Sequence, residues 1–244
     1  MMLDIFLGAI VVFLATAAGA AVAFFFGCVD KTKYSAMLSF SAGAMAFSAI
    51  EMLSQAHGMA GDAVVAVGFL LGFLALMGAE KLLPHVHMHL RKKELGKSKT
   101  KAALIAGTIA LHNVPEGFAI ATAFAASNPL GWFVTTSIAL QDIPEGALVS
   151  TPLACYGIGV KKSVFFGMLS GFIEGVAAIF GYLFLSSFAA LVPPALAFSA
   201  GAMVYVIFVE ILPDALEGGM ERVVALSFAA GAAITFGLAS LLAV

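Results

Sequence analysis

The chain has 244 residues, of which 62% are hydrophobic and only 11% are charged. Soluble domains are roughly 45–50% apolar and about 25% charged, so this composition excludes a soluble domain and predicts an all-α integral membrane protein. The formal net charge of −2 says little about partners, and we expect the lipid bilayer, not nucleic acid, to surround the chain.

The twelve Lys and Arg residues divide the chain into apolar intervals that hold one, two, two, two and one spans. Each two-span interval is broken by a turn signal without Lys or Arg, at 57–62, 127–129 and 186–194. All twelve basic residues therefore lie on one side, which the positive-inside rule makes cytoplasmic, and both termini are predicted to be extracytoplasmic. The eight predicted helices of this single transmembrane domain, 1–244, span about residues 3–27, 34–56, 62–83, 102–126, 130–156, 163–186, 193–213 and 221–243.

A six-residue segment of the second predicted helix returns unchanged in the seventh. Phe-Ser-Ala-Gly-Ala-Met stands at 40–45 and again at 198–203. These helices run in opposite directions, as do the fourth and the fifth, which also contain related segments. The pattern predicts an inverted repeat with 3+2+3 organisation and a site near the midplane. The alternative is that this segment serves only the close packing of helices through small residues.

The loop over 84–101, predicted to be cytoplasmic, contains three alternating histidines, His85, His87 and His89, ahead of a basic run. Such a tract is typical of labile metal binding, with a solvated basic loop as the alternative. Glu210, near the inner end of the seventh predicted helix, is a second candidate for passing ions to the cytoplasm.

Two related hexads carry the strongest functional signal. His-Asn-Val-Pro-Glu-Gly stands at 112–117 and Gln-Asp-Ile-Pro-Glu-Gly at 141–146. A carboxylate near the bilayer centre costs roughly 2.5–3.5 kcal/mol, so it marks a functional site by default. Within each hexad the first, second and fifth side chains share one helix face. The proline removes a backbone donor and the glycine admits a neighbouring backbone, which suits an ion site that exchanges ligands.

Four helices place metal donors at one depth. At 1.5 Å per residue, His112 lies roughly 16 Å beyond the boundary at Lys101, and Gln141 lies roughly 16 Å below the outer break. Glu174 and Met45 each lie roughly 18 Å beyond the nearest lysine. Half of the hydrocarbon core is about 15 Å thick, so all four lie near the midplane.

The carboxylates at this depth sum to −4, which two divalent cations would neutralise: Glu116, Asp142, Glu145 and Glu174. In one arrangement the first ion takes His112, Glu116, Gln141 and Glu145, with Met45 as a further donor. The second ion takes Asn113, Asp142 and Glu174, and shares Glu116 and Glu145. Nitrogen and sulfur donors in the first set suit Zn²⁺, Cd²⁺ or Fe²⁺, whereas the second set, all oxygen, accepts harder ions. The alternative is a buried structural polar network.

With eight spans, outside termini, a histidine-bearing cytoplasmic loop and the HNVPEG hexad, the whole chain resembles the ZIP (Zrt/Irt-like) family of divalent metal transporters, especially its bacterial GufA-like branch. The resemblance implies uptake of Zn²⁺, and also of Cd²⁺, Fe²⁺ or Mn²⁺, through a binuclear centre in the plasma membrane, the inner membrane of a bacterium. It implies the ligands Met45, His112, Asn113, Glu116, Gln141, Asp142, Glu145 and Glu174, a homodimer, and an elevator-like movement of one helix group. Many eukaryotic members have His-Glu-x-Pro-His-Glu in the fifth span, so the different residues at 141–146 argue against a strict zinc preference.

Two other functions compete with a transporter. Bridging carboxylates also serve intramembrane di-metal enzymes, but ferritin-like oxidases use Glu-x-x-His pairs and this chain has His-x-x-x-Glu. A passive metal channel would use the same residues, and the sequence does not separate it from a carrier. We expect no enzyme activity and no catalytic cofactor, with metal ions as the substrate.

Overall fold

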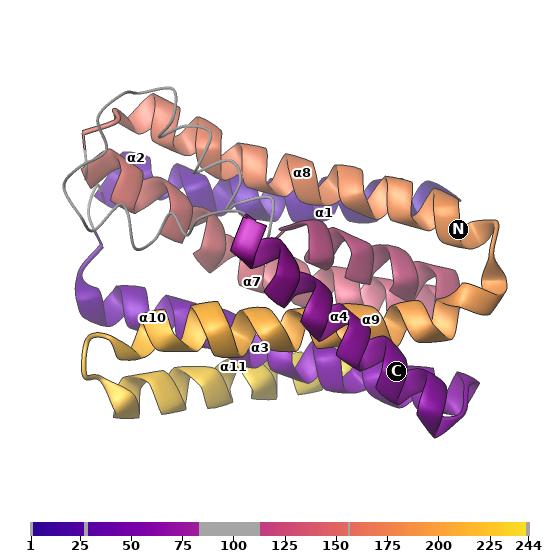
Figure 1. Cartoon of the computed structure of the whole chain (residues 1–244). Coiled ribbons are helices and arrows are strands. Elements are labelled where there is room, and N and C mark those ends of the chain that lie inside the picture. The colour runs from indigo at the N-terminus through magenta and orange to yellow at the C-terminus, as the bar shows by residue number, and fades with distance from the viewer. Residues whose placement is uncertain (1, 27–28, 83–112, 156, 243–244) are drawn as a thin grey trace.

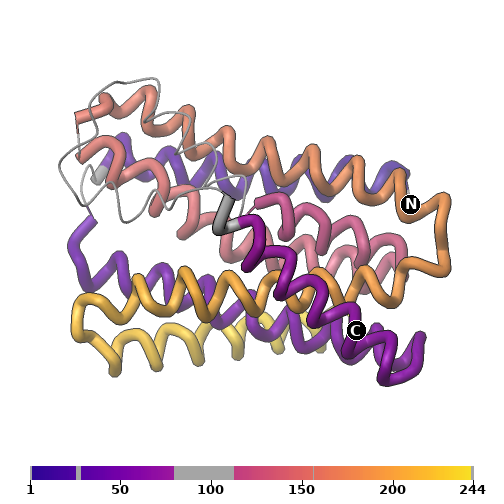
Figure 2. The backbone as a smooth tube through the Cα atoms, viewed as in Figure 1, coloured from indigo at the N-terminus to yellow at the C-terminus, as the bar shows by residue number. Residues whose placement is uncertain are grey.

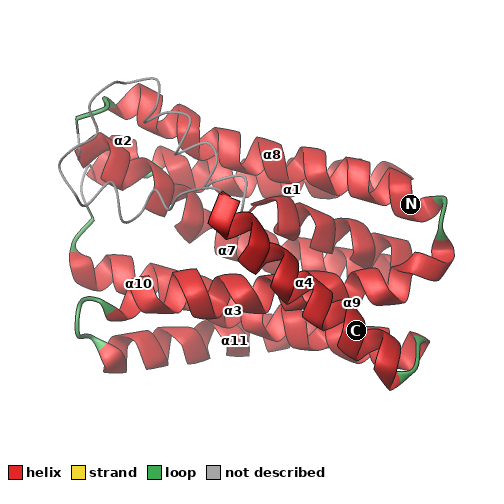
Figure 3. Cartoon of the chain, viewed as in Figure 1, coloured by secondary structure: helices red, strands yellow, loops and turns green. Residues whose placement is uncertain are grey.

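A computed structural model of the chain describes residues 2–26, 29–82, 113–155 and 157–242. Within these ranges every regular element is a helix and there is no strand, as Figure 3 shows. The predicted all-α class is therefore confirmed for this part of the chain. His112 and the loop with His85, His87 and His89 lie outside the described residues.

The fourth predicted helix is described only over residues 113–126. In chain order the elements are α1 (Met2–Ala21), α2 (Ala23–Phe26), α3 (Lys31–Met59), α4 (Asp62–Leu82), the 113–126 helix, α7 (Asn128–Cys155), α8 (Val160–Ser186), the 3₁₀ turn η1 (Ala189–Leu191), α9 (Val192–Val206), the π-turn η2 (Ile207–Ile211), α10 (Leu212–Leu216) and α11 (Glu221–Leu242).

Two helix ends differ from the sequence-based expectation for local reasons. The Asp30 side chain accepts a hydrogen bond from the Lys33 backbone N–H at 3.0 Å, and this N-cap starts α3 at Lys31 instead of residue 34. At the other difference, Pro213 lacks an N–H and crowds the preceding turn. The helix absorbs this by a π-turn, in which the Leu212 N–H donates to the Ile207 carbonyl, and it continues to Leu216.

Six helices of the described residues are long and apolar enough to cross a membrane: Met2–Phe25, Lys31–Met59, Asp62–Ala79, Val160–Ser186, Ala189–Leu216 and Glu221–Leu242. α7 is long enough, with 28 residues, but its polar residues lower its mean hydropathy. The fourth predicted span is only partly described. The eight-span layout therefore stays a prediction.

The helices pack in two groups (Figure 1). α1, α7 and α8 contact one another, and α3 packs on α9 and α11 while α4 packs on α9. The two groups meet where α3 lies against α7. The largest apolar cluster extends across this meeting surface and includes Met45, Phe124, Phe133 and Met203.

Five basic residues of the described elements lie at one end of the bundle. Figure 2 shows that α3, α8 and α11 all begin at the same end, and their first turns hold Lys31, Lys33, Lys161, Lys162 and Arg222. Both labelled chain ends in Figure 1 lie away from that end. These five positions fit the expected charge distribution, and the orientation of the chain in a membrane stays a prediction.

α3 and α11 cross in close backbone contact. A Cβ added at Gly43 would overlap the Phe228 carbonyl oxygen, and one added at Gly231 would overlap the Phe40 carbonyl oxygen. Each glycine is thus in contact with a backbone carbonyl of the other helix, and that carbonyl belongs to the residue three positions before the other glycine. Small residues allow this approach in membrane helices, where van der Waals packing drives association.

α4 and α9 repeat the same crossing. A Cβ at Gly72 would overlap the Phe198 carbonyl oxygen, and one at Gly201 would overlap the Phe69 carbonyl oxygen. All four helices therefore use a Phe-x-x-Gly segment, including both copies of the Phe-Ser-Ala-Gly-Ala-Met repeat. The repeated segment packs alike in its two positions, which generic helix packing does not require.

We expect Gly43→Ala to destabilise the protein, because the added methyl group cannot fit between α3 and α11. Overpacking of this kind costs about 1–3 kcal/mol. The measurement is the Tm of the detergent-purified protein, which should fall by several degrees. Gly237→Ala on α11 is the control, since a Cβ there meets no atom of the described residues within 4 Å. Equal Tm values for the two variants would contradict the close crossing.

Candidate metal centre

Three carboxylates from the two hexads converge between the 113–126 helix and α7. One oxygen from each of Glu116, Asp142 and Glu145 lies within 4.8 Å of those from the other two. Glu116 and Asp142 are buried, and Glu145 is half-buried. Pro144 lies inside α7 beside two of these residues. Three negative oxygens at this spacing form a set that a cation can hold together.

Glu174 brings a fourth carboxylate from α8. Its carboxylate interacts electrostatically with Glu116 and Glu145, and it also adjoins Asp142. Both oxygens of Glu174 and both of Asp142 are buried without a hydrogen-bond donor among the described residues. Buried carboxylates without donors are costly unless a cation or a proton neutralises them. These residues therefore fit a divalent metal ion.

Gln141 links the two hexads through its side chain. Its Nε2 donates a hydrogen bond to Glu116 Oε1 at 2.6 Å, while its Oε1 is buried without a donor among the described residues. The Ser41 hydroxyl of α3 donates to the Gln141 backbone carbonyl at 3.2 Å. Met45, one turn after Ser41 and 1% exposed, lies on the same face of α3. The thioether of Met45 is thus on the side of α3 that faces α7.

Asn113 is oriented from α8. The Ser170 hydroxyl donates to Asn113 Oδ1 at 2.7 Å, and both residues are buried. Sequence reasoning missed Ser170, although it lies four residues before Glu174 and so shares that helix face. Ser41 was missed for the same reason, as it lies four residues before Met45. A search for hydroxyl residues one turn from each candidate ligand would have found both.

Glu210 is not part of the carboxylate cluster of the described residues. It is half-buried in the π-turn η2, which leads through α10 to the end of the bundle where α11 begins.

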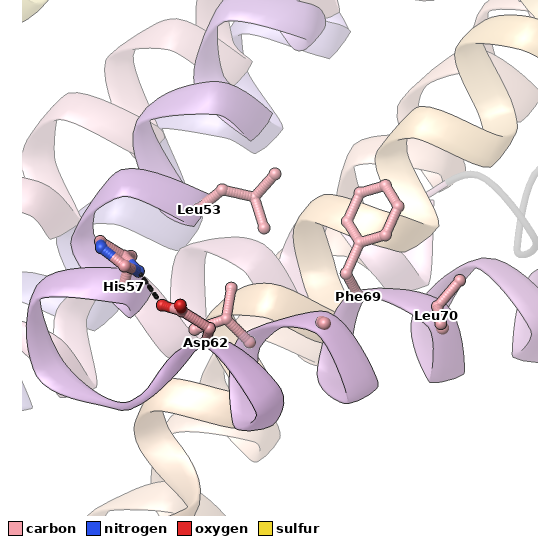
Figure 4. Close-up of a pocket in the computed structure, with 7 residues that line it drawn as sticks. Leu53, His57, Asp62, Phe69 and Leu70 are labelled. Atoms are coloured by element: carbon pink, nitrogen blue, oxygen red, sulfur yellow. Dashed lines mark ion pairs between the residues drawn. The ribbon is translucent and has the colours of Figure 1, made fainter.

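A pocket of about 540 Å³ lies between the end of α3 and the start of α4, as Figure 4 shows. His57 Nδ1 lies 3.1 Å from Asp62 Oδ1 at its rim, and both side chains are largely exposed. The other lining residues are apolar: Leu53, Val65, Ala66, Phe69 and Leu70. With only two donors on an open surface, this pocket does not form a second buried centre.

Sequence comparison relates the chain to known zinc transporters. A sequence model of the ZIP zinc transporter family matches residues 88–244. Zinc transporter GufA of Myxococcus xanthus is 44% identical over 160 residues, which cover 65% of this chain and 63% of that protein. Zinc transporter ZIP11 of Xenopus tropicalis is 42% identical over 131 residues, or 51% of this chain and 39% of that protein. Zinc transporter ZIPB of Bordetella bronchiseptica is 34% identical over a 246-residue alignment that covers 93% of this chain and 78% of that protein. The chain thus covers less than two thirds of the length of the first two relatives.

Ser170→Ala tests whether the hydrogen bond to Asn113 supports metal binding. Outer-shell partners of metal ligands typically contribute 10–100-fold in affinity, so we expect a loss of at least about 10-fold, measured by equilibrium dialysis of the purified protein. Ser163→Ala is the control, because Ser163 is also buried on α8 but its hydroxyl bonds, within the described part of the chain, only to the Gly159 carbonyl. If Ser170→Ala binds metal with the affinity of the parent protein, then either Asn113 is not a ligand or Ser170 does not position it.

Proposed function

The chain belongs to the ZIP zinc transporter family, and we propose that it moves divalent transition-metal ions across a membrane into the cytoplasm. The observation that carries this proposal is the cluster of buried carboxylates, in which the oxygens of Asp142 and Glu174 have no donor among the described residues. Zn²⁺ is the first substrate proposed, because the three relatives are named zinc transporters. Mixed nitrogen, oxygen and sulfur donors also accept Cd²⁺, Fe²⁺ and Mn²⁺. The metal ion is the substrate, and we propose no catalytic reaction.

Two metal positions share the carboxylates. The first takes His112, Glu116, Gln141 and Glu145 with Met45, and the second takes Asn113, Asp142 and Glu174 with the same Glu116 and Glu145. The 4.8 Å convergence of Glu116, Asp142 and Glu145 supports shared ligands. Four carboxylates balance two divalent ions in charge, so the centre as a whole is neutralised only when both positions are filled.

The Gln141 amide makes the first position exchangeable. Its Nε2 donates to Glu116 Oε1 at 2.6 Å. A metal ion in the first position would bind this same Glu116 oxygen. An amide that rotates presents its oxygen to a metal and gives up this hydrogen bond. Loading and release then exchange one hydrogen bond for one metal contact, so the Glu116 oxygen keeps a partner in both states. Glu210 and the histidines at 85, 87 and 89 are the proposed release route.

We also propose eight spans in an inverted 3+2+3 repeat, with both termini outside a plasma membrane, the bacterial inner membrane. The basic first turns of α3, α8 and α11 at one end support the orientation by the positive-inside rule. The matching Phe-x-x-Gly crossings of α3 with α11 and of α4 with α9 support the repeat. A homodimer is proposed from family resemblance alone.

Glu116→Ala and Glu145→Ala should each abolish metal uptake, because each carboxylate serves both positions. The assay is uptake of Zn²⁺ and Mn²⁺ into proteoliposomes that contain the purified chain. Glu221→Ala, an exposed carboxylate at the start of α11, is the control and should transport as the parent does.

Two results would contradict the shared-ligand proposal. One is two bound ions per chain in purified Glu116→Ala protein, counted by elemental analysis. The other is an uptake rate near that of the parent in either variant, after correction for the amount of folded protein in the vesicles.

The orientation is tested by reporter fusions in bacterial cells. Alkaline phosphatase fused after Val244 should be active, since it folds only outside the cytoplasm. The same reporter fused after Gly219, in the connection before α11, should be inactive there, and a fluorescent-protein fusion at that point should fluoresce. Reversed activities at these two points would overturn the proposed topology.

A further inference from the structure

The two Pro-Glu-Gly segments meet their neighbouring helices in the same register. At the first segment, a Cβ added at Gly117 would overlap the Glu174 carbonyl oxygen of α8 and would lie 3.0 Å from the Ala178 backbone nitrogen. The 113–126 helix thus packs closely on one turn of α8. That turn begins at Glu174, whose carboxylate belongs to the candidate centre.

The second segment makes the same contact with α1. A Cβ added at Gly146 would overlap the Thr16 carbonyl oxygen and would lie 2.8 Å from the Ala20 backbone nitrogen. The contacts again fall on a residue and on the nitrogen four positions later. Thr16 therefore occupies on α1 the place that Glu174 occupies on α8.

The side chains follow the same correspondence. Glu174 approaches Asn113, the second residue of the first hexad, and Thr16 approaches Asp142, the second residue of the other hexad. Neither carboxylate receives a hydrogen bond of standard geometry from these neighbours. Each pair thus combines one carboxylate with one neutral polar side chain, and the carboxylate is on opposite partners in the two pairs.

The surroundings of Thr16 leave its oxygen available as an acceptor. The side chain is 1% exposed, and its hydroxyl donates its proton to the Val12 carbonyl at 2.8 Å. The hydroxyl lone pairs remain for another partner. A Cβ at Gly171 of α8 would lie only 2.7 Å from Thr16 Oγ1, so this glycine keeps space for the hydroxyl one turn before Glu174.

We propose that the Thr16 hydroxyl is the oxygen ligand that α1 contributes to the second metal position, opposite Glu174. This inference deepens the proposed function and rests on it. A neutral oxygen completes an all-oxygen set for a harder ion such as Mn²⁺. It does so without adding a fifth negative charge, so two divalent ions still balance the centre.

The test compares Thr16→Val, which removes the hydroxyl at nearly constant volume, with Thr16→Ser, which keeps it. The control is Thr151→Val, since Thr151 is also 1% exposed and also bonds the carbonyl four residues earlier at 2.8 Å, but lies beyond the hexad on α7. Binding of Mn²⁺ and Zn²⁺ by the full-length chain in detergent is measured by equilibrium dialysis and elemental analysis.

We expect Thr16→Val to lose Mn²⁺ affinity by about 10-fold or more, with a smaller loss for Zn²⁺. Thr16→Ser and Thr151→Val should match the parent. If the valine variant does not fold, Thr16→Ala and Thr16→Ser are compared in the same assay, with the same expected difference.

Parental Mn²⁺ affinity in Thr16→Val, or an equal loss in Thr151→Val, would overturn the role of Thr16 and leave the transporter proposal intact. A parent protein that binds no divalent ion would overturn the proposed function, and this inference with it.

Discussion

The fold is organised around the cost of placing four carboxylates together in an apolar interior. Like charges at this spacing repel strongly when water does not screen them, so the cluster of Glu116, Asp142, Glu145 and Glu174 is stable only with compensating positive charge. Neutral donors and acceptors fill the remaining space, and the 2.6 Å bond from Gln141 to Glu116 is the clearest example. The centre therefore fits cations, and the surrounding helices hold its geometry.

Close backbone contacts at glycines hold that geometry. These contacts lie within each helix group, and α3 and α7 meet in another way. Inside each helix group, glycines pack directly against backbone carbonyl oxygens of the neighbouring helix, as Gly146 does against Thr16 and Gly43 against Phe228. Between the groups, α3 meets α7 through hydroxyl contacts instead, such as Ser48 Oγ to Ser137 Oγ at 2.5 Å. Interlocked backbones resist sliding, whereas side-chain hydrogen bonds can be exchanged as helices shift. The surface between α3 and α7 is the one best suited to the relative movement that the family resemblance implies.

The sequence predicted the helical class and the carboxylates that converge in the structure, because hydropathy and basic residues report depth and the hexad spacing reports a helix face. It could not report how each helix is rotated against its neighbours. Nothing in the sequence distinguishes Ser170 and Thr16 from other hydroxyl residues. Only the packing of their helices places them beside Asn113 and Asp142. The predicted ends of two helices were wrong for a different reason. The cap at Asp30 and the π-turn before Pro213 depend on local backbone hydrogen bonds, which a hydropathy pattern does not describe. The placement of His112 and of the histidine loop stays a prediction.

A duplicated backbone explains why the centre can be both regular and asymmetric. The two Pro-Glu-Gly segments repeat their contacts with α8 and α1, so the framework places equivalent side chains at equivalent depths. The side chains differ in opposite senses: Glu174 faces a neutral amide at Asn113, and Asp142 faces a neutral hydroxyl at Thr16. A symmetric centre with one carboxylate in each pair would also total −4, so the asymmetry decides which helix carries each carboxylate and leaves the total charge unchanged. Different side chains within a shared register give the two halves of the centre different oxygen donors, while the geometry, which depends on backbone contacts, stays the same.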